Sequence, residues 1–453
     1  MTEDFRRHPI DEQYVARLAE RGLRMTVVDP DDVEGQAAYP HAVNRGFHEP
    51  DRTEEQYRTF RDALQRRRLV AVYDDRIAHP WPIATVGSWS TELTLPATAA
   101  GEGRVARSWA ISTVTVLPTH ARQGIARAML EQELRVAAER GHPYAMLTVS
   151  EATLYGRYGF APAADATSWR IDTARVRWVG HPTPRRLEPA TLEAARDEAE
   201  RVYERVRPNR PGWIPVWPER WGQLFAIGSG IAPDEKGVRR AVVARDEHGT
   251  ATAVATYHVT STGNDFEEHE LHVDFIVASD AAGLAAVWGY LVQMPLVAVV
   301  HAHLQPTDLP LRWLLGDERA ARVTVGDHQW VRILDVPAAL AARGYLEAGA
   351  LRLRVHDGLG YAEGDWMLRV DADADGAAKV AAAVDDPEAD AAPGLELDVA
   401  ALSALSLGGV TPFELAQAGR ITELGPDAGS GRALAAADRL LRSAVAPSLT
   451  VWY

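Results

Sequence analysis

The sequence contains no cysteine, and only two of its residues, Lys236 and Lys379, are lysines. The absence of cysteine excludes disulfides, thiolate metal sites and a cysteine nucleophile, and it fits a reducing cytoplasm. No apolar run approaches the ~18 residues that span a bilayer. The first residues, Met1 to Arg7, also lack the apolar core of a secretory signal. We therefore expect a cytoplasmic protein that does not enter a membrane.

Acidic residues outnumber basic ones. The 453 residues include 48 lysines and arginines and 63 aspartates and glutamates, which gives a net charge of −15. A negative field repels nucleic acid and anionic lipid and favours cationic partners. The 15 histidines show no metal-ligand spacing, so we expect no metal site. The scarcity of lysine fits coding bias in a GC-rich genome, and an amine-modifying enzyme that avoids modifying itself is the second explanation.

The length favours three domains, and the pattern along the chain agrees. In the first third it predicts strands over 23–28, 69–73, 83–95, 104–116 and 144–149. Helices are expected over 53–65 and 124–140, with a short one from residue 151 to 159. The proline-containing link 181–184 suggests the first domain boundary.

The middle third repeats the order of three strands followed by a helix. We expect strands over 241–244, 251–259 and 269–277, and helices over 190–206 and 281–293. The second boundary is expected at 326–330. In the last third the pattern predicts strands over 351–355 and 366–370, a surface hairpin or loop over 371–392, and helices over 399–404, 413–418 and 432–442.

The most informative segment runs from Val114 to Arg127, where a strand, a tight turn and a helix start are expected. Backbone N–H groups at such a turn point at one spot, where the helix dipole favours an anion. Gly124 lets the backbone approach closely, and Arg122 and Arg127 add positive charge. Cations oppose the dipole at a helix N-terminus, so they make more sense if a phosphate lies there. The alternative is an ordinary glycine turn with solvated arginines.

A second segment, from Ser150 to Phe160, reads Ser-Glu-Ala-Thr-Leu-Tyr-Gly-Arg-Tyr-Gly-Phe. Ser150 is a candidate helix N-cap, and Tyr155 follows within the first turns. Taken alone, a packed tyrosine with a satisfied hydroxyl is the commoner case.

Together these segments resemble the signatures of the GNAT superfamily of acyl-CoA-dependent N-acetyltransferases. Residues 121–126 are similar to the family's pyrophosphate-binding turn, Arg/Gln-x-x-Gly-x-Gly/Ala, with Ala121 at the first position. Residues 155–160 are similar to its Tyr-x-x-x-Gly-Phe signature. The residues around both segments, and residues 330–340, resemble the actinobacterial Eis (enhanced intracellular survival) family.

The Eis resemblance implies an α+β chain with two tandem GNAT-like mixed-sheet domains followed by a sterol-carrier-protein-like α+β domain. We assign the N-terminal GNAT domain, with the acetyl-CoA site, to residues 1–181. The second, degenerate GNAT-like domain is assigned to residues 182–327 and the third domain to residues 328–453. The resemblance also implies a ring-shaped homo-oligomer, a hexamer.

The resemblance further implies which residues hold the acyl donor. The backbone of Val114, Thr115 and Val116 would bind the pantetheine arm, as an added strand would. The pyrophosphate would lie on the turn, whose residues are Arg122, Gln123, Gly124, Ile125, Ala126 and Arg127. Ser150 and Glu151 would contact the donor near its reactive end, and Tyr155 would protonate the departing thiolate. A phenol with a pKa of about 10 suits that role.

The same family uses its C-terminal carboxylate as general base, which here is that of Tyr453. Residues 449–452 are apolar or aromatic apart from Thr450, unlike a frayed tail, and a terminal strand packed for stability is the alternative. An α-carboxyl with an ordinary pKa of about 3.5 is a poor base for an ammonium, so the role requires desolvation or a water relay. Glu151 and Glu49 are reserve candidates, and Phe47 and Glu49 lie where the resemblance implies an amine pocket.

The expected second domain has a different helix start, residues 277–285. Asp280 replaces the leading arginine or glutamine, and an aspartate there would repel pyrophosphate. We therefore expect this domain to keep the fold without binding CoA. The tryptophans Trp213, Trp217 and Trp221 are expected in the core, and the alternative is that one of them lines a pocket between domains.

We expect an acetyl-CoA-dependent N-acetyltransferase that attacks the thioester directly with the neutral amine. Acetyl-CoA is the only cosubstrate implied, and small cationic amines such as aminoglycosides and polyamine-like compounds are the implied acceptors. Lysine side chains of proteins are a second class of acceptor. Two alternatives stay open: a protein that binds CoA without catalysis, which Ala121 favours, and a carrier of apolar ligands in the third domain.

Overall fold

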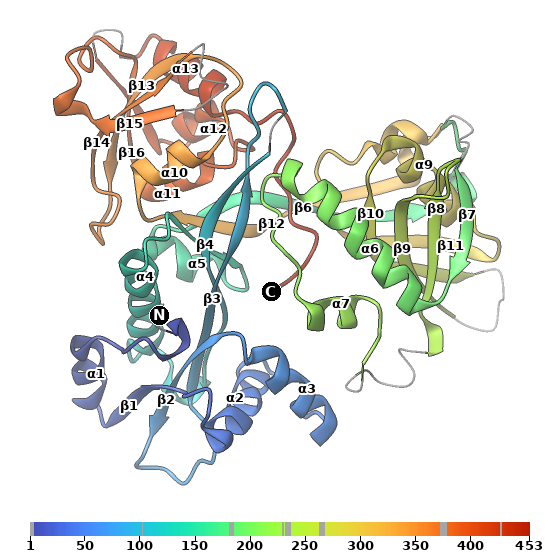
Figure 1. Cartoon of the computed structure of the whole chain (residues 1–453), viewed down its shortest axis with the longest axis horizontal. Coiled ribbons are helices and arrows are strands. Elements are labelled where there is room, and N and C mark those ends of the chain that lie inside the picture. The colour runs from blue at the N-terminus through green and yellow to red at the C-terminus, as the bar shows by residue number, and fades with distance from the viewer. Residues whose placement is uncertain are drawn as a thin grey trace.

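The computed structural model describes residues 4–101, 103–180, 185–228, 231, 237–261, 268–371, 378–425 and 428–453. It has an α+β architecture with one sheet of twelve strands and one of five. Figure 1 shows three regions in chain order, with the third region above the first and the second to one side. Among the residues that the structure describes, no helix combines the length and the apolar character that a membrane span requires.

The first region contains half of the large sheet, with helices on both faces. Its elements are β1 (Leu23–Val27), β2 (Arg68–Asp74), β3 (Ala84–Leu95), β4 (Arg104–Val116), β5 (Tyr144–Thr148), α1 (Glu12–Ala19), α2 (Val33–Gly46), α3 (Glu54–Leu64), α4 (Ile125–Glu139) and α5 (Ala152–Tyr155). Alternate side chains of a strand face opposite sides. Val70 and Val72 therefore pack with α1 and α4, whereas Leu69 and Ala71 pack with α2.

The second region has the same kind of sheet, and two of the helices named below pack against it. Its elements are β7 (Arg186–Ala190), β8 (Arg240–Arg245), β9 (Ala251–Thr260), β10 (His269–Ala278), β11 (Val297–Gln305), α6 (Leu192–Val206), α7 (Pro218–Leu224) and α9 (Ala281–Val292). The strands and helices that the sequence predicted here are confirmed, with ends that differ by a few residues.

Two long strands, β6 (Ala161–Asp172) and β12 (Ala321–Ile333), join the two regions into one sheet. The strand order is β1-β2-β3-β4-β5-β12-β6-β11-β10-β9-β8-β7. Residues 329–333 of β12 pair with β5, and residues 321–331 pair with β6. The expected boundary at 326–330 therefore falls inside a strand. Gly326 and Asp327 gave that segment the composition of a loop, but the strand ladder on both sides overrides their weak strand propensity.

The third region is a separate five-stranded sheet covered by helices. Its elements are β13 (Gly349–His356), β14 (Gly364–Val370), β15 (Ala378–Ala382), β16 (Gly394–Asp398), β17 (Ile421–Leu424), α10 (Val336–Ala342), α11 (Val399–Leu405), α12 (Pro412–Gln417) and α13 (Arg432–Leu441). The order is β15-β14-β13-β16-β17, with β13 and β16 parallel. Of the expected hairpin or loop over 371–392, residues 372–377 lie outside the described residues, and β15 forms a strand after them.

The last segment of the chain returns from the third region to the junction of all three (Figure 1). Leu449 and Val451 are fully buried, and the Val451 carbonyl contacts Nε2 of His328 at 3.0 Å. Trp213 donates its indole N–H to the Ser448 hydroxyl at 3.1 Å. The tail is therefore packed, and it delivers Tyr453 to the middle of the molecule.

Candidate functional site

A bulge in β4 opens the sheet where the site lies. Thr113 has a φ of +50°, and the parallel pairing of β4 with β5 covers only residues 108–111. Beyond that point β3 still pairs with Thr115 and Val116. In the part of the chain that the structure describes, no strand pairs with the other edge of residues 114–116. Their main-chain groups are therefore available to an extended ligand, as the sequence predicted for the pantetheine arm.

The turn before α4 leaves the helix start open. Gly124 is the N-cap residue with a φ of +79°, and no side chain of the described residues caps α4. Arg122 also has a positive φ, +63°. A Cβ at Gly124 would meet nothing closer than 4.0 Å, so open space lies over the first amides of the helix. Uncapped amides at a helix N-terminus favour an anion, and a pyrophosphate fits this place.

These elements line a cleft of about 1270 Å³. Ten of the eleven predicted donor-binding residues line it: Val114, Thr115, Val116, Arg122, Gly124, Ile125, Ala126, Arg127, Ser150 and Glu151. Gln123 is not among the lining residues, and its carbonyl accepts a hydrogen bond from the Arg21 guanidinium. The open turn and the exposed edge of β4 thus belong to one continuous space.

The charges of this cleft differ from the expectation that Arg122 and Arg127 of the turn supply its positive charge. Arg127 donates to Glu131 at 2.6 Å, so its charge is partly neutralised. Ala121 lines the cleft and supplies no cation. Two arginines of the α1 segment lie nearby, because Nη2 of Arg17 and Nη1 of Arg21 would both lie 4.0 Å from a Cβ on Gly124. Arg17 also lies 3.8 Å from Glu131, and the sequence motif gave no sign of either arginine.

The third region also borders this cleft, which we call the donor cleft because the predicted donor-binding residues line it. Its contribution comes from the loop after β13 and from the start of α11, namely His356, Asp357, Gly358, Leu359, Asp398, Val399 and Ala400. Arg332 of β12 ties this loop to the first region, since it donates to Asp357 at 2.7 Å and to the Tyr158 carbonyl at 3.1 Å. No local sequence signal could have identified residues that reach the cleft from another domain.

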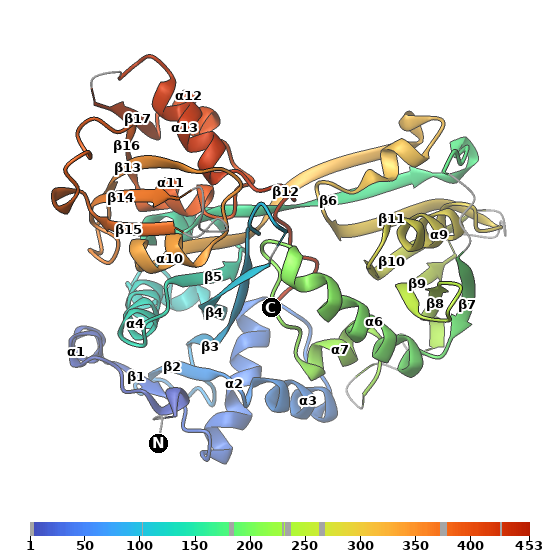
Figure 2. The same cartoon turned by 45° about the horizontal axis from the view of Figure 1, so that its top comes forward.

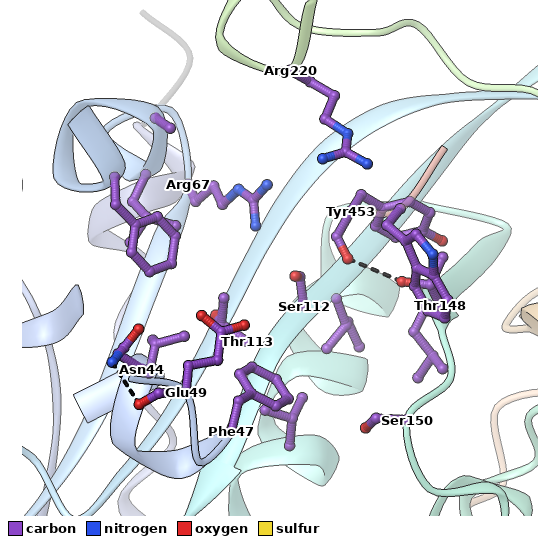
Figure 3. A pocket seen from close by; sticks show the side chains of 18 of the residues that line it. Asn44, Phe47, Glu49, Arg67, Ser112, Thr113, Thr148, Ser150, Arg220 and Tyr453 are labelled. Atoms are coloured by element: carbon purple, nitrogen blue, oxygen red, sulfur yellow. Dashed lines mark hydrogen bonds between the residues drawn. The ribbon is translucent and has the colours of Figure 1, made fainter. Parts of the chain in front are cut away.

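A second, smaller cavity of about 380 Å³ meets the cleft. It lies between α2, α3, β4, β5 and α7, and Figure 3 shows its side chains. Phe47, Val114 and Ser150 line both spaces. The predicted amine-pocket residues Phe47 and Glu49 both line this cavity, and so does Trp217. Trp213 and Trp221 are buried in the core, as predicted.

Tyr155 stands where the two spaces meet. It lines the smaller cavity, and only 3% of its surface is exposed. Burial raises the pKa of the Tyr155 phenol, and a hydrogen bond with Ser150 opposes that shift. The phenol is therefore protonated at neutral pH, which a proton donor requires.

Tyr453 also lines the smaller cavity. Thr148 donates its hydroxyl to the main-chain oxygen of Tyr453 at 3.0 Å, as the dashed line in Figure 3 shows. The ring packs edge-on against Trp89, with ring centroids 5.5 Å apart. Burial raises the pKa of the Tyr453 phenol, so that hydroxyl stays protonated and only the α-carboxylate could accept a proton.

The two other candidates for the general base, Glu49 and Glu151, line different spaces. Glu49 lines the smaller cavity, where Arg52 donates to its carboxylate at 2.5 Å. Glu151 lines the donor cleft and is not among the residues of the smaller cavity. The Glu49 carboxylate is thus held in an ion pair, and Glu151 lies outside the smaller cavity.

The N-terminus of α9, the corresponding helix of the second region, is capped by a side chain. Asp280 caps α9, because its carboxylate accepts from the Gly283 amide at 2.6 Å, and it pairs with Arg185 at 2.7 Å. A carboxylate therefore already occupies the place that a phosphate would take. This supports the prediction that the second domain does not bind CoA.

Comparisons with known proteins agree with this architecture. Residues 32–163 and 212–333 each match an acetyltransferase (GNAT) domain, and residues 336–450 match a sterol carrier protein domain. An uncharacterized N-acetyltransferase of Streptomyces avermitilis is 33% identical over 436 residues, which are 92% of this chain and 98% of that protein. The N-acetyltransferase Eis of Mycobacterium tuberculosis is 32% identical over 323 residues, 69% of this chain and 73% of Eis.

A solved structure has the same fold. Eis1 from Mycobacterium abscessus gives a TM-score of 0.75 at 25% identity, over 95% of this chain and 100% of that chain. Two GNAT domains and a sterol carrier domain define an N-acetyltransferase of the GNAT class, and the predicted fold class is confirmed. The chain belongs to the Eis family of these enzymes.

Proposed function

We propose that this N-acetyltransferase transfers the acetyl group of acetyl-CoA directly to a primary amine. The observation that carries the proposal is the meeting of the two spaces at Phe47, Val114 and Ser150, beside Tyr155. The cleft of about 1270 Å³ has the volume for a large donor, and the smaller cavity suits an acceptor. A donor and an acceptor bound at the same time can react without a covalent enzyme intermediate.

In the proposed reaction the amine nitrogen forms a bond to the acetyl carbonyl carbon, and the carbon–sulfur bond breaks. Tyr155 gives its proton to the departing thiolate, whose conjugate acid has a pKa of about 8.5. The raised pKa of Tyr155 keeps the proton available until that step. Main-chain groups of residues 114–116 hold the donor in register, because one edge of that segment is open.

The proton that the amine loses goes to the carboxylate of Tyr453, directly or through water. Support comes from the main-chain oxygen of Tyr453, which lies in the cavity wall and is oriented by Thr148. The fully buried residues Leu449 and Val451 anchor the tail that carries this carboxylate.

Cationic amines are the acceptor class that the family resemblance and the negative net charge favour, and they stay a prediction. The homohexamer and the cytoplasmic location also stay predictions. A protein that binds CoA without catalysis remains the second candidate function, because Ala121 lacks the expected side-chain contact. Arg17 and Arg21, near Gly124, reduce the weight of that argument.

The test is release of CoA thiol from acetyl-CoA, with and without an amine, in wild type and in Tyr155→Phe. We expect amine-dependent release that falls about 10²–10⁴-fold in the variant, with CoA affinity nearly unchanged in both proteins. Amine-independent or absent release, with intact CoA binding, would favour the binding protein instead. Equal turnover in the two proteins would remove Tyr155 from the acid role.

A further inference from the structure

Two arginines line the smaller cavity at the end away from the donor. Arg67 follows α3, and Arg220 lies in α7 of the second region. Figure 3 shows both guanidinium groups directed into the cavity, at the opposite end of the view from Phe47 and Ser150. Neither residue belongs to a sequence motif, and neither was predicted.

Neither arginine forms an ion pair with a carboxylate of the described residues. Arg67 stacks on Trp89, 4.1 Å from the ring centroid, and on Trp217 at 5.3 Å. Arg220 donates to the side-chain amide oxygen of Gln223 at 2.9 Å, and its Nε has no partner. Among the described residues, no carboxylate lies within 4.0 Å of either guanidinium.

Both side chains keep some surface open to the cavity, yet the surrounding protein is close enough that burial lowers the pKa of each to about 10. They therefore remain charged at neutral pH. Glu219 raises the pKa of Arg67 and Arg220 lowers it, so the two guanidinium groups act on each other. Two partly desolvated like charges with no carboxylate in contact are costly to maintain, and a ligand of opposite charge offsets that cost.

The other charges of the cavity do not cancel this pair. Glu49 is already matched by Arg52. The α-carboxylate of Tyr453 is the remaining negative group, and the proposed function uses it as the base near the reacting amine. Two cations at one end, with Phe47 and Ser150 at the other, give the cavity a direction.

We propose that the acceptor is a small primary amine that also carries a carboxylate, which Arg67 and Arg220 bind. The amine then points toward Ser150 and Tyr155, where the cavity meets the donor cleft. Phe60 and Trp217 also line the cavity, so it accepts an apolar or aromatic body. This inference rests on the proposed function and replaces the cationic acceptor class with an anionic one.

Physical chemistry supports a carboxylate in particular. Guanidinium groups recognise carboxylates through paired, charge-assisted hydrogen bonds. The cavity of about 380 Å³ is at the small end of ligand pockets, which favours a compact acceptor. A polycation such as an aminoglycoside would bring further positive charge to the two arginines.

The test compares amines that differ only in the carboxylate. Thiol release from acetyl-CoA is measured with 4-(2-aminoethyl)benzoate and with 3-(2-aminoethyl)benzoate, each against 2-phenylethylamine. Spermidine and kanamycin represent the cationic class. We expect kcat/KM to be higher for at least one carboxylate-bearing amine by about tenfold to a hundredfold, the range of a charged hydrogen bond.

Variants assign the preference to the two arginines. Arg67→Gln and Arg220→Gln are expected to bring the ratio of the two kcat/KM values toward one, with little loss for 2-phenylethylamine. Arg67→Lys, which keeps the charge, should retain part of the preference. Arg66→Gln is the matched control, because Arg66 is an exposed neighbour outside the cavity. Thermal unfolding of each variant checks that the fold is intact.

The outcomes separate the acceptor class from the reaction. Release with spermidine or kanamycin, and none or less with both carboxylates, overturns the acceptor class and keeps the proposed function. No release with any amine counts against the proposed function. In that case calorimetry with N-acetylated 4-(2-aminoethyl)benzoate, in the presence of CoA, decides the acceptor: binding that Arg67→Gln and Arg220→Gln abolish supports the class, and no binding overturns it.

Discussion

At the residue scale, the site depends on how burial sets the protonation of Tyr155. The phenol is enclosed at the meeting point of the two spaces, and burial raises its pKa. The residues that line the cleft could be predicted through the family resemblance, because the signatures that carry it are local in the sequence. Arg67 and Arg220 were not predictable, because they come from distant parts of the chain and meet only in the folded protein.

The pH dependence of turnover follows from this burial. Tyr155 can donate a proton only while it is protonated, so its deprotonation sets the alkaline limb of kcat. Because the pKa is raised, the limb should lie above the ordinary tyrosine value of about 10. A pH–rate profile with Tyr155→Phe alongside measures this, and circular dichroism at each pH checks the fold. A limb below pH 10 that is absent in the variant would contradict the raised pKa.

At the element scale, the contrast between two helix starts is the main feature. Helix α4 begins at Gly124 with no side-chain cap from the described residues, whereas α9 is capped by Asp280. The same topology therefore gives one open anion site and one closed site. The sequence showed part of this difference, because Asp280 stands at the first position of the motif, where the first domain has Ala121. That this aspartate caps α9 is seen only in the structure.

Filling the open helix start should weaken donor binding. Gly124→Val places a β-branched residue at a φ of +79° and a side chain in the donor cleft. We expect the affinity for CoA to fall at least about tenfold, the effect of roughly 1.4 kcal/mol, by calorimetry. Gly141→Val is the matched control, since Gly141 has a φ of +69° at the other end of α4 and does not line the cleft. Equal losses in both variants would show that backbone strain, and not the cleft, is responsible.

The terminal segment makes a second prediction at this scale. One alanine added after Tyr453 moves the terminal carboxylate by up to ~3.6 Å. Because misplacement by about 1 Å can cost 10²-fold, we expect kcat to fall at least tenfold while CoA affinity stays unchanged. Thr148→Val, which removes the hydrogen bond to Tyr453, should give a smaller loss. A fully active extended protein with a normal unfolding temperature would exclude the carboxylate as base.

At the scale of the whole molecule, β6 and β12 turn two acetyltransferase domains into one continuous sheet. Neither strand was predicted from the sequence. Residues 161–172 are rich in alanine, and residues 321–333 contain Gly326 and Asp327, so local preference for a strand is weak in both. Pairing with sequence-distant partners supplies the stability, and a local pattern cannot reveal it.

This pairing predicts that the first domain is incomplete alone. Residues 1–181 lack β12, which lies between β5 and β6, so we expect no cooperative urea transition for that fragment. Since Ala321 pairs with Ile171 in an antiparallel ladder, residues 321–334 can be joined after residue 172 by a short turn. We expect cooperative unfolding to return in the joined fragment. Equal cooperativity without β12 would mean that the strand is dispensable for this domain.

The central claim is that donor and acceptor occupy adjoining spaces together and react directly. Initial rates of thiol release, with acetyl-CoA and a productive amine varied against each other, test this claim most directly. The account predicts double-reciprocal lines that intersect, as a ternary complex requires. Parallel lines, the mark of a covalent acetyl-enzyme and a ping-pong mechanism, would contradict it.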